Sequence, residues 1–468
     1  MSKNEQEWLE KVILSAAVGI MGAAGTAWLG KKFLKKAVNG FLYRLMVDSY
    51  PENLWEFASA ARKFGLQTIV ETNLRTQKGR MINRPLGSPR KFPNLDSLMF
   101  NFAQLQTLPT DEGILPLTEV IIGPEAKRPL ILQIPIIIAP MAYGLSLSAK
   151  AKTALAKGSA LAGTATNTGE GPFLPAERQT AKNLILQYNR GKWSKTAKIL
   201  RQADAIEIYF GQGATGGVGH FIDDQEVNWL VKKRMGLKLG EKGVVHATFP
   251  GIENTDKIVH LVEKLRDITG GVPIGGKIAA GKFIERDLEI LVKAGVDFIT
   301  VAGAEEGTKN SPPILEDDFG LPLLWALCRA ANFLEKNNLK DKISLIATGG
   351  LATPGAYLKA VALGADAVYI GSIALFAMTH TQVLKALPWE PPPEIVFFKG
   401  KYQNKLNIRK GAENLQKYLK ACQEEMQEGI RALGKTNIKE LNRQDLFALD
   451  QLTAEAAGVP LGNREIGD

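Results

Sequence analysis

Short apolar runs rich in β-branched residues recur along the middle of the chain, and segments with the period of an amphipathic helix fill most of the intervals. Those helical segments include 148–161, 256–267, 283–294, 322–337 and 354–363. Eight short buried strands alternating with helices over about 250 residues predict an α/β fold, a closed (β/α)8 TIM barrel at 131–388. The expected strands are 134–139, 161–166, 205–210, 244–249, 272–278, 298–302, 343–347 and 367–370.

The segments on either side of the predicted barrel have different patterns. Prolines, among them Pro85, Pro89 and Pro93, break residues 48–130 into short pieces, which predicts an N-terminal arm lying on the larger domain. Within residues 389–468, two stretches have helical character, 411–434 and 443–458. They predict a C-terminal helical extension packed against the barrel or a partner.

Residues 1–47 are predicted to be a membrane anchor with a basic flank. Residues 12–30 carry no charge and as a helix would be about 28 Å long, close to the thickness of a bilayer core. A buried helix rich in Ala and Gly is the alternative, and acidic residues before the run disfavour a secretory signal. The basic residues that follow place the rest of the chain on the cytoplasmic side of the membrane by the positive-inside rule. They are Lys31, Lys32, Lys35, Lys36 and Arg44.

Composition narrows the classes of function. The chain is 45% hydrophobic and 23% charged, values typical of globular proteins, and its two cysteines, Cys328 and Cys422, exclude a cysteine-rich metal site. The net charge of +10 is compatible with lipid, nucleic acid or an acidic substrate. The basic segments 189–201 and 231–242 lack an aromatic stacking platform, so we expect solvated helix faces or lipid contacts there and no nucleic acid.

Active sites of such barrels lie at the carboxyl ends of the strands, so residues there are the first candidates for function. The last two expected strands end in Gly349 and Gly350 and in Gly371 and Ser372, each pair followed by a helical segment. Glycine lets backbone N–H groups approach a phosphate, and a helix N-terminus favours its charge. The pattern predicts a site for a phosphate-bearing ligand, with tight turns as the alternative.

Several ionisable or polar residues in the predicted barrel could take part in chemistry. Lys277, in the fifth strand, could hold a carboxylate, form a Schiff base or place positive charge beside a flavin. The structural alternative is a lysine in an ion pair or at the rim of the barrel. Glu207, inside a strand, is either functional or salt-bridged in the core. His246 could act as a catalytic acid or base, and the alternative is a hydrogen-bonded histidine buried in the core. Four further candidates in the expected loops are Glu170, Gln212, Glu305 and Thr308.

One glycine pattern favours a different fold, a doubly wound sheet. Gly211, Gly213 and Gly216 satisfy GxGxxG after an expected strand. A dinucleotide fingerprint should open directly into a helix and place an acidic residue about 20 positions later, whereas Asp223 and Asp224 come too early. We therefore interpret residues 211–219 as a loop at the end of a barrel strand.

Taken together, the loop sequences resemble the FMN-binding synthase domain of the glutamate synthase family, in its short stand-alone form. The matching segments keep the family's order and spacing over about 250 residues, the length of one such barrel. They are APMAYG (139–144), TNTGEG (166–171), EIYFGQGATGG (207–217), GGKIAAG (275–281) and the phosphate-binding end at 347–372.

The resemblance implies an FMN enzyme that reduces the imine of 2-oxoglutarate and ammonia to glutamate. Lys277, Gln212 and Glu207 are its candidate catalytic residues. Lys277 would also tune the flavin or bind a substrate carboxylate. The candidate cofactor-binding residues are Met141, Ala142, Tyr143, Gly144, Thr166, Lys277, Gly303, Gly349, Gly350, Gly371 and Ser372.

The sequence also departs from the family's pattern. No cysteine precedes Cys328, so the glutaminase nucleophile is missing, and residues 375–411 lack the cysteines of the family's iron–sulfur cluster. Ammonia and electrons must then come from elsewhere, the electrons from a separate protein or NAD(P)H. Thr215 and Gly216 replace the Lys-Pro of QGAKPG, and the GGTG-like loop reads Glu306, Gly307, Thr308, Lys309. Substrate specificity therefore stays open, between this reaction, another flavin-barrel reaction and a non-catalytic flavin module serving a membrane partner.

Overall fold

The computed structural model describes residues 29–464 except 54, 253, 310, 389 and 390. The chain divides into two compact units, Met1–Ile82 and Asn83–Asp468. The run predicted to enter a membrane, residues 12–30, lies outside the described residues except for its last two positions. In the part of the chain that is described, no helix combines the length and apolar character needed to cross a bilayer.

The first unit is helical where it is described. Residues 29–47 form one helix. It is followed by the short η1 (Tyr50–Glu52), α2 (Trp55–Phe64) and α3 (Leu66–Lys78). The last helix ends where Gly79 adopts a left-handed conformation, with φ of 58°, and donates its N–H to the carbonyl of Arg75.

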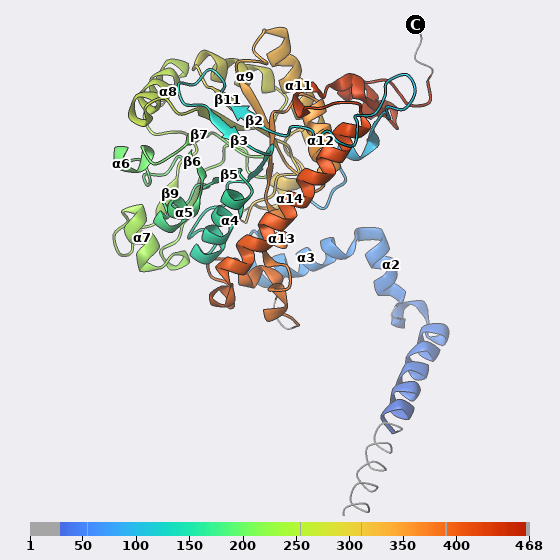
Figure 1. Cartoon of the computed structure of the whole chain (residues 1–468). Helices are drawn as coiled ribbons and strands as arrows, with labels where there is room; N and C mark the ends of the chain where they lie inside the picture. The colour runs from blue at the N-terminus through green and yellow to red at the C-terminus, as the bar shows by residue number, and fades with distance from the viewer. Residues whose placement is uncertain (1–28, 54, 253, 310, 389–390, 465–468) are drawn as a thin grey trace, which may run out of the picture. The chain divides into compact units, whose positions relative to one another are not determined.

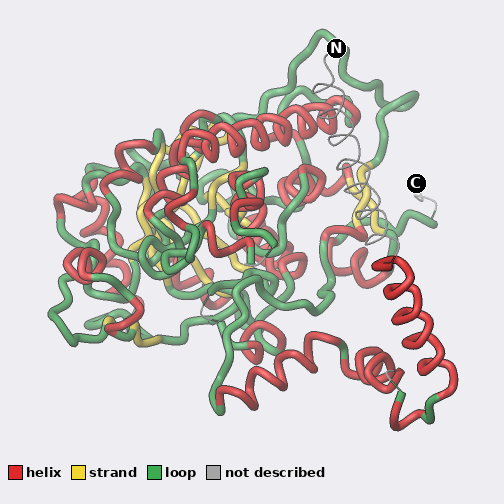
Figure 2. Tube along the Cα trace, turned by 90° about the horizontal axis from the view of Figure 1, so that it is seen from below, coloured by secondary structure: helices red, strands yellow, loops and turns green. Residues whose placement is uncertain are grey.

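The second unit contains the predicted barrel, with eight parallel strands that close on themselves (Figure 1). Consecutive strands pair in chain order, and the last pairs with the first through Ile370 and Ile138, which closes the barrel. Helices surround these strands (Figure 2). The prediction of a (β/α)8 barrel is thus confirmed. Its strands are β4 (Ile136–Ile138), β5 (Ala165–Asn167), β6 (Asn183–Tyr188), β7 (Ala205–Tyr209), β10 (Ile274–Ala279), β11 (Phe298–Ala302), β12 (Ser344–Thr348) and β13 (Ala367–Ile370).

One of the eight predicted strands was wrong, and one real strand was missed. The run 244–249 does not join the barrel; β9 (Gly243–Val245) pairs antiparallel with β8 (His220–Ile222) in a separate hairpin. The missed barrel strand is β6. The helix between β6 and β7 is only α6 (Ala197–Leu200), so the helical interval that marks other strands is too short to be recognised there. His246 follows β9 and is exposed, so it is neither a core histidine nor a residue of a barrel strand.

The five helices expected between strands are confirmed to within about two residues. They are α4 (Ala149–Leu161), α8 (Thr255–Thr269), α9 (Ile284–Lys293), α11 (Leu323–Lys336) and α12 (Pro354–Ala362). Shorter helices in loops are α5 (Pro175–Thr180), α7 (Trp229–Met235), α10 (Pro313–Asp317) and α13 (Ser372–Thr379). The 3-10 turns of this unit are η2 (Leu95–Ser97), η3 (Asp224–Glu226), η4 (Val383–Lys385), η5 (Pro392–Ile395), η6 (Gln403–Lys405), η7 (Ile438–Glu440) and η8 (Arg443–Asp445).

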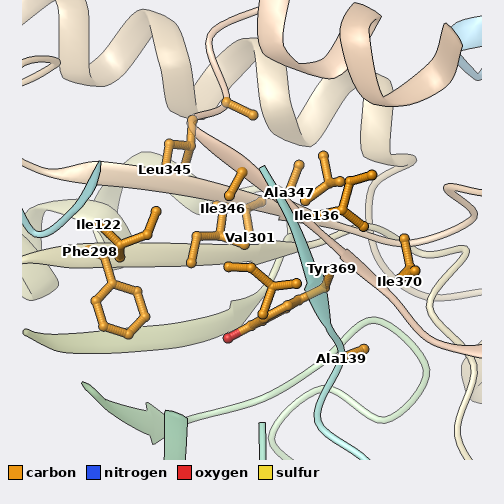
Figure 3. Packing of buried hydrophobic residues seen from close by; sticks show 14 of the residues in the cluster. Ile122, Ile136, Ala139, Phe298, Val301, Leu345, Ile346, Ala347, Tyr369 and Ile370 are labelled. Carbon is orange, nitrogen blue, oxygen red and sulfur yellow. The ribbon is translucent and has the colours of Figure 1, made fainter. Parts of the chain in front are cut away.

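The core of the second unit is built from the inward and outward faces of the barrel strands. Ile346, Val301 and Tyr369 belong to one buried cluster, which Figure 3 shows from close by. Phe298 is fully buried, and a side chain at Gly275 on the neighbouring strand would collide with its ring. Replacing such a buried aromatic residue by alanine usually costs about 3–5 kcal/mol, so this layer contributes strongly to stability.

Segments from both ends of the second unit pack on the barrel. Two small antiparallel pairs, β1 (Leu98–Phe100) with β14 (Leu446–Ala448) and β2 (Val120–Ile122) with β3 (Leu130–Leu132), lie in these flanks. The long helix α14 (Ile408–Ala432) contacts α4, α12 and α13, while α15 (Gln451–Ala457) contacts α11. The predicted helix at 411–434 is therefore confirmed as α14 on the barrel, whereas the stretch 443–458 is an α-helix only over Gln451–Ala457 and begins with η8 and β14.

Candidate active site at the carboxyl ends of the barrel strands

A cavity of about 360 Å³ lies at the carboxyl ends of the strands. Its wall includes the ends of β12 and β13, the loops after β4 and β11, and residues from β6 and β7. This is the face on which barrel enzymes carry their active sites. We therefore take this cavity as the candidate active site.

The predicted phosphate-binding residues meet at one end of the cavity. Gly349, Gly350, Gly371 and Ser372 all line it. Gly349 and Gly350 have φ of 127° and 67°, a region that residues with a Cβ rarely adopt. Gly371 is the N-cap of α13, and no side chain caps that helix, so its first N–H groups have no side-chain acceptor. Backbone N–H groups of glycines and of a helix start are the donors with which proteins commonly bind a phosphate group.

Of the four residues expected to face a flavin after β4, only two reach the cavity. Met141 and Ala142 line it. Tyr143 is buried instead in a second hydrophobic cluster, where its ring meets that of Phe398 edge to face at 6.2 Å. A side chain at Gly144 would come within 2.7 Å of Val231, so this glycine packs against α7. The turn after β4 thus places its first two residues, Met141 and Ala142, at the cavity and the next two, Tyr143 and Gly144, against neighbouring hydrophobic side chains.

Two further predicted cofactor residues lie behind the cavity wall. Thr166 on β5 is fully buried, and its hydroxyl has no hydrogen-bond partner among the described residues. Gly303 follows β11, and a side chain there would come within 2.6 Å of Leu323 at the start of α11. Neither residue belongs to the cavity wall, where both were expected.

Glu207 points into the barrel and is held entirely by neutral donors. Its Oε1 accepts hydrogen bonds from Asn167 Nδ2 and Gln187 Nε2, each at 2.9 Å. Its Oε2 accepts from Thr300 Oγ1 at 2.9 Å and from the hydroxyl of Tyr369 at 2.8 Å. Burial and the nearby carboxylate raise the pKa of Tyr369 well above its usual value, which keeps that hydroxyl a donor. Of the two sequence alternatives, the inward orientation is present and no ion pair is found within the described residues.

Lys277 is fully buried on β10 and does not form part of the cavity wall itself. Its Nζ lies 2.6 Å from Glu306 Oε1, and it sits 5.8 Å from the centroid of the Tyr369 ring. Both neighbours line the cavity. The lysine therefore stands directly behind the wall, in an ion pair that the sequence offered only as an alternative.

Gln212 and Glu170 both line the cavity and bring polar groups to its wall. The loop that carries Gln212 leads from β7 into β8 and not into a helix, which confirms the interpretation of residues 211–219. The carbonyl of Gly217 in this loop accepts a hydrogen bond from the buried Arg190. Glu170 Oε1 lies 3.5 Å from His220 Nε2, and Glu170 Oε2 is buried without a hydrogen-bond partner among the described residues.

The loop after β11 contributes two more charged side chains. Glu305 lines the cavity and accepts a hydrogen bond from the N–H of Leu323 at 2.8 Å, and burial raises its pKa to about 7. Lys309 donates to the carbonyl of Leu145 at 2.9 Å and lies 5.7 Å from the ring centroid of Phe397, and burial lowers its pKa. Thr308 also lines the cavity, as expected of a loop residue.

Sequence reasoning missed several residues of the wall. Gln187 lies on the unrecognised strand β6, and Tyr209 and Tyr369 were taken only as parts of apolar strands. A tyrosine hydroxyl in a buried strand needs a partner, and that signal could have identified Tyr369. Within the described part of the chain, no cluster of three or more His, Cys, Asp or Glu side chains could hold a metal ion.

Comparison with known proteins gives consistent matches. Residues 88–436 match the family model described as a conserved region in glutamate synthase. The chain is 31% identical to a glutamate synthase large subunit-like protein of Rhizobium meliloti, over 84% of this chain and 93% of that one. It is 30% identical to an archaeal-type glutamate synthase [NADPH] of Thermotoga neapolitana, over 74% of this chain and 67% of that one.

Solved structures with the same kind of barrel are more distant. A mandelate oxidase variant with a monooxide FMN adduct has a TM-score of 0.47 and 16% identity, covering 75% of this chain and 87% of that one. A flavocytochrome b2 variant with sulfite bound has a TM-score of 0.48 and 18% identity, covering 79% and 80%.

Proposed function

Because the chain belongs to the glutamate synthase family, we propose that its barrel reduces the imine formed from 2-oxoglutarate, or a related 2-oxo acid, and ammonia. In this reaction a hydride adds to the imine carbon and a proton to its nitrogen, which gives the amino acid, glutamate in the first case. The observation that carries the proposal is a group of glycines at one cavity, with a buried lysine directly behind the wall of the same cavity.

The chain is an FMN-dependent oxidoreductase of the glutamate synthase type. When bound and reduced by the external electron donor, FMN would supply the hydride and become oxidised. The residues present are suited to this cofactor, because the glycine cradle and the uncapped start of α13 offer donors to a phosphate. Gly349, Gly350, Gly371 and Ser372 would hold the phosphate, and Met141 and Ala142 would lie against the rest of the cofactor.

The protein's own residues have distinct proposed roles. Lys277 places a buried ammonium behind the cavity wall, where it can stabilise negative charge that develops on a bound group to the extent that its partner Glu306 does not offset it. Gln212 offers an amide to substrate or cofactor from the opposite loop. Glu207 accepts a hydrogen bond from the hydroxyl of Tyr369 and thereby fixes one part of the wall. It acts as a positioning residue and not as a catalytic acid.

Electrons and ammonia come from outside this chain in our proposal. Residues 375–411 contain no cysteine, so the iron–sulfur ligands of the longer family members are missing from that segment. We expect a separate electron-donor protein or NAD(P)H to reduce the cofactor. The experiment uses purified full-length protein with FMN, reduced anaerobically by light and then mixed with 2-oxoglutarate and ammonium.

Reoxidation of the reduced protein that matches glutamate formed would support the proposal. A visible flavin spectrum with no reoxidation by any 2-oxo acid and ammonium would contradict it and would favour a flavin module that passes electrons to a partner. Protein that is colourless and fails to take up added FMN at micromolar concentration would remove the cofactor assignment as well.

We further propose that residues 12–30 attach the enzyme to the cytoplasmic face of the membrane. The uncharged run and the lysines that follow it support this proposal. Full-length protein should sediment with membranes, whereas protein lacking residues 1–36 should stay in the supernatant and still bind FMN. Full-length protein in the soluble fraction without detergent would contradict the proposal.

A further inference from the structure

The ion pair of Lys277 and Glu306 joins two strand ends behind the cavity wall. Lys277 comes from β10, and Glu306 reaches it from the loop after β11, at 2.6 Å between Nζ and Oε1. The hydroxyl of Thr348, at the end of β12, donates to the same Oε1 at 3.2 Å. The pair is thus held in one arrangement by three neighbouring parts of the barrel.

Glu306 is itself fixed by its own loop. Its backbone N–H donates to the carbonyl of Gly303 at 3.1 Å, and a Cβ at Gly349 would lie 3.3 Å from this same nitrogen. Its Oε2 is buried and has no hydrogen-bond partner among the described residues. The side chain is 12% exposed and lines the cavity, so the carboxylate borders the space in which the cofactor would bind.

The pair changes the electrostatics of the site. A buried lysine alone would present a full positive charge to the cavity, whereas a lysine with a carboxylate at 2.6 Å forms a unit of zero net charge. The position of Glu306 corresponds to the first glycine of the GGTG-like loop in the family pattern. The carboxylate is therefore an added charge in this chain.

We propose that Glu306 is a positioning residue that lowers the reduction potential of the bound FMN by offsetting the charge of Lys277. The inference rests on the FMN cofactor of the proposed function and not on its substrate. Two-electron reduction places negative charge on a flavin, and nearby protein charge tunes its electronics. A free ammonium would favour the reduced form, and the carboxylate beside it weakens that effect.

The test is the midpoint potential of FMN in the full-length protein, measured by equilibrium titration against a reference dye. The net charge of the pair is zero in the wild type, positive in E306Q, negative in K277M and zero again in K277M/E306Q. We expect E306Q to raise the potential by at least about 30 mV, a tenfold change in the two-electron equilibrium constant. K277M should lower it, and the double variant should return close to the wild type.

Controls separate this effect from general changes in charge or folding. Lys293 and Glu289 form an exposed pair on α9 at 2.8 Å, so K293M and E289Q should leave the potential unchanged. Sulfite, which adds negative charge to a flavin ring, should bind more tightly in E306Q and less tightly in K277M. If E306Q fails to fold, E306G removes the same charge and serves in its place.

Several results would overturn the inference. These are an unchanged potential in the charge-removing Glu306 variant, a double variant that follows E306Q instead of the wild type, and a folded Glu306 variant that no longer binds FMN. The last result would make Glu306 a binding group. Lack of activity with 2-oxoglutarate would affect only the proposed substrate, because the potentials are measured without it.

Discussion

Two carboxylates enter the interior of this barrel, and their surroundings differ. Glu207 lies deep among the strands, with four neutral donors sharing its two oxygens. Glu306 lies at the cavity, where one oxygen meets an ammonium and a hydroxyl and the other has no partner among the described residues. A carboxylate whose hydrogen bonds are complete supports the fold, whereas one with a free acceptor beside a cavity can interact with a ligand.

The charges of Glu207 and Glu306 are also compensated in different ways. The charge of Glu207 is spread over a closed network, so its neighbours are fixed in orientation. The charge of Glu306 is balanced by one lysine, so removing either partner changes the field in the cavity. The predictions below test whether the first site is mainly structural and the second mainly electrostatic.

The largest effect is expected for Glu207→Ala. This change leaves the donor groups of Asn167, Gln187, Thr300 and Tyr369 facing a void, and each unsatisfied buried donor costs about 1–3 kcal/mol without simple additivity. We expect the free energy of unfolding to fall by about 3–5 kcal/mol in urea titration. A loss of unfolding free energy below about 1 kcal/mol would mean that the network is dispensable and would contradict a mainly structural role of Glu207.

The next effect concerns Lys277→Met, which keeps the aliphatic bulk and removes the charge. A charge-assisted contact contributes about 1.5–3 kcal/mol, so we expect turnover or substrate affinity to fall at least roughly tenfold. Steady-state kinetics with 2-oxoglutarate and ammonium measures this. Full turnover together with an unchanged flavin potential would make Lys277 a purely structural partner of Glu306.

A smaller effect is expected for Gly350→Ala at the phosphate end. The left-handed φ of 67° disfavours alanine by about 1–2 kcal/mol, and the new Cβ would lie 3.0 Å from that of Glu305. FMN affinity should fall by roughly tenfold in fluorescence titration. Unchanged FMN affinity in the folded variant would place the phosphate elsewhere in the cavity.

The smallest effect is a pH dependence that arises from Glu305. Its pKa is raised by burial to about 7 in the folded protein, above its usual value of 4.5. The folded state therefore holds this proton over a pH range in which the unfolded state has lost it, and the contribution to stability falls as the pH rises from about 4.5 through 7.

Ionised Glu305 also lies next to the expected phosphate, so FMN affinity should weaken severalfold as the pH rises through about 7. Glu305→Gln keeps an acceptor for the N–H of Leu323 and should flatten both profiles. Identical pH profiles in the variant and the wild type would show that another group titrates.

The parts of the molecule that follow from local sequence pattern were predictable. Strong strand and helix signals gave the barrel, and the glycines after β12 and β13 indicated the phosphate end, because backbone conformation and helix starts depend on neighbouring residues. Strand β6 was missed because the helix after it, α6, is too short to mark it. The run 244–249 was wrongly placed in the barrel because an apolar run does not reveal which sheet a strand joins.

Contacts between distant segments could not be predicted in the same way. Lys277 was recognised as a candidate, but its partner Glu306 is brought to it by the loop after β11 and the end of β12. Tyr143 follows β4 as expected, yet its ring turns toward Phe398, far away in sequence. Such pairings depend on the packing of the whole barrel, which a pattern along one segment does not encode.

The long helix α14 lies over the seam where the barrel closes. It contacts α4, which follows the first strand, and α12 and α13, which flank the last strand. A growing polypeptide therefore emerges with both edges of its sheet exposed, and the segment that braces their junction is synthesised after all eight strands. The barrel of this protein can acquire its full support only after residue 432 has been synthesised, and until then its early strands are the part of the chain most open to aggregation.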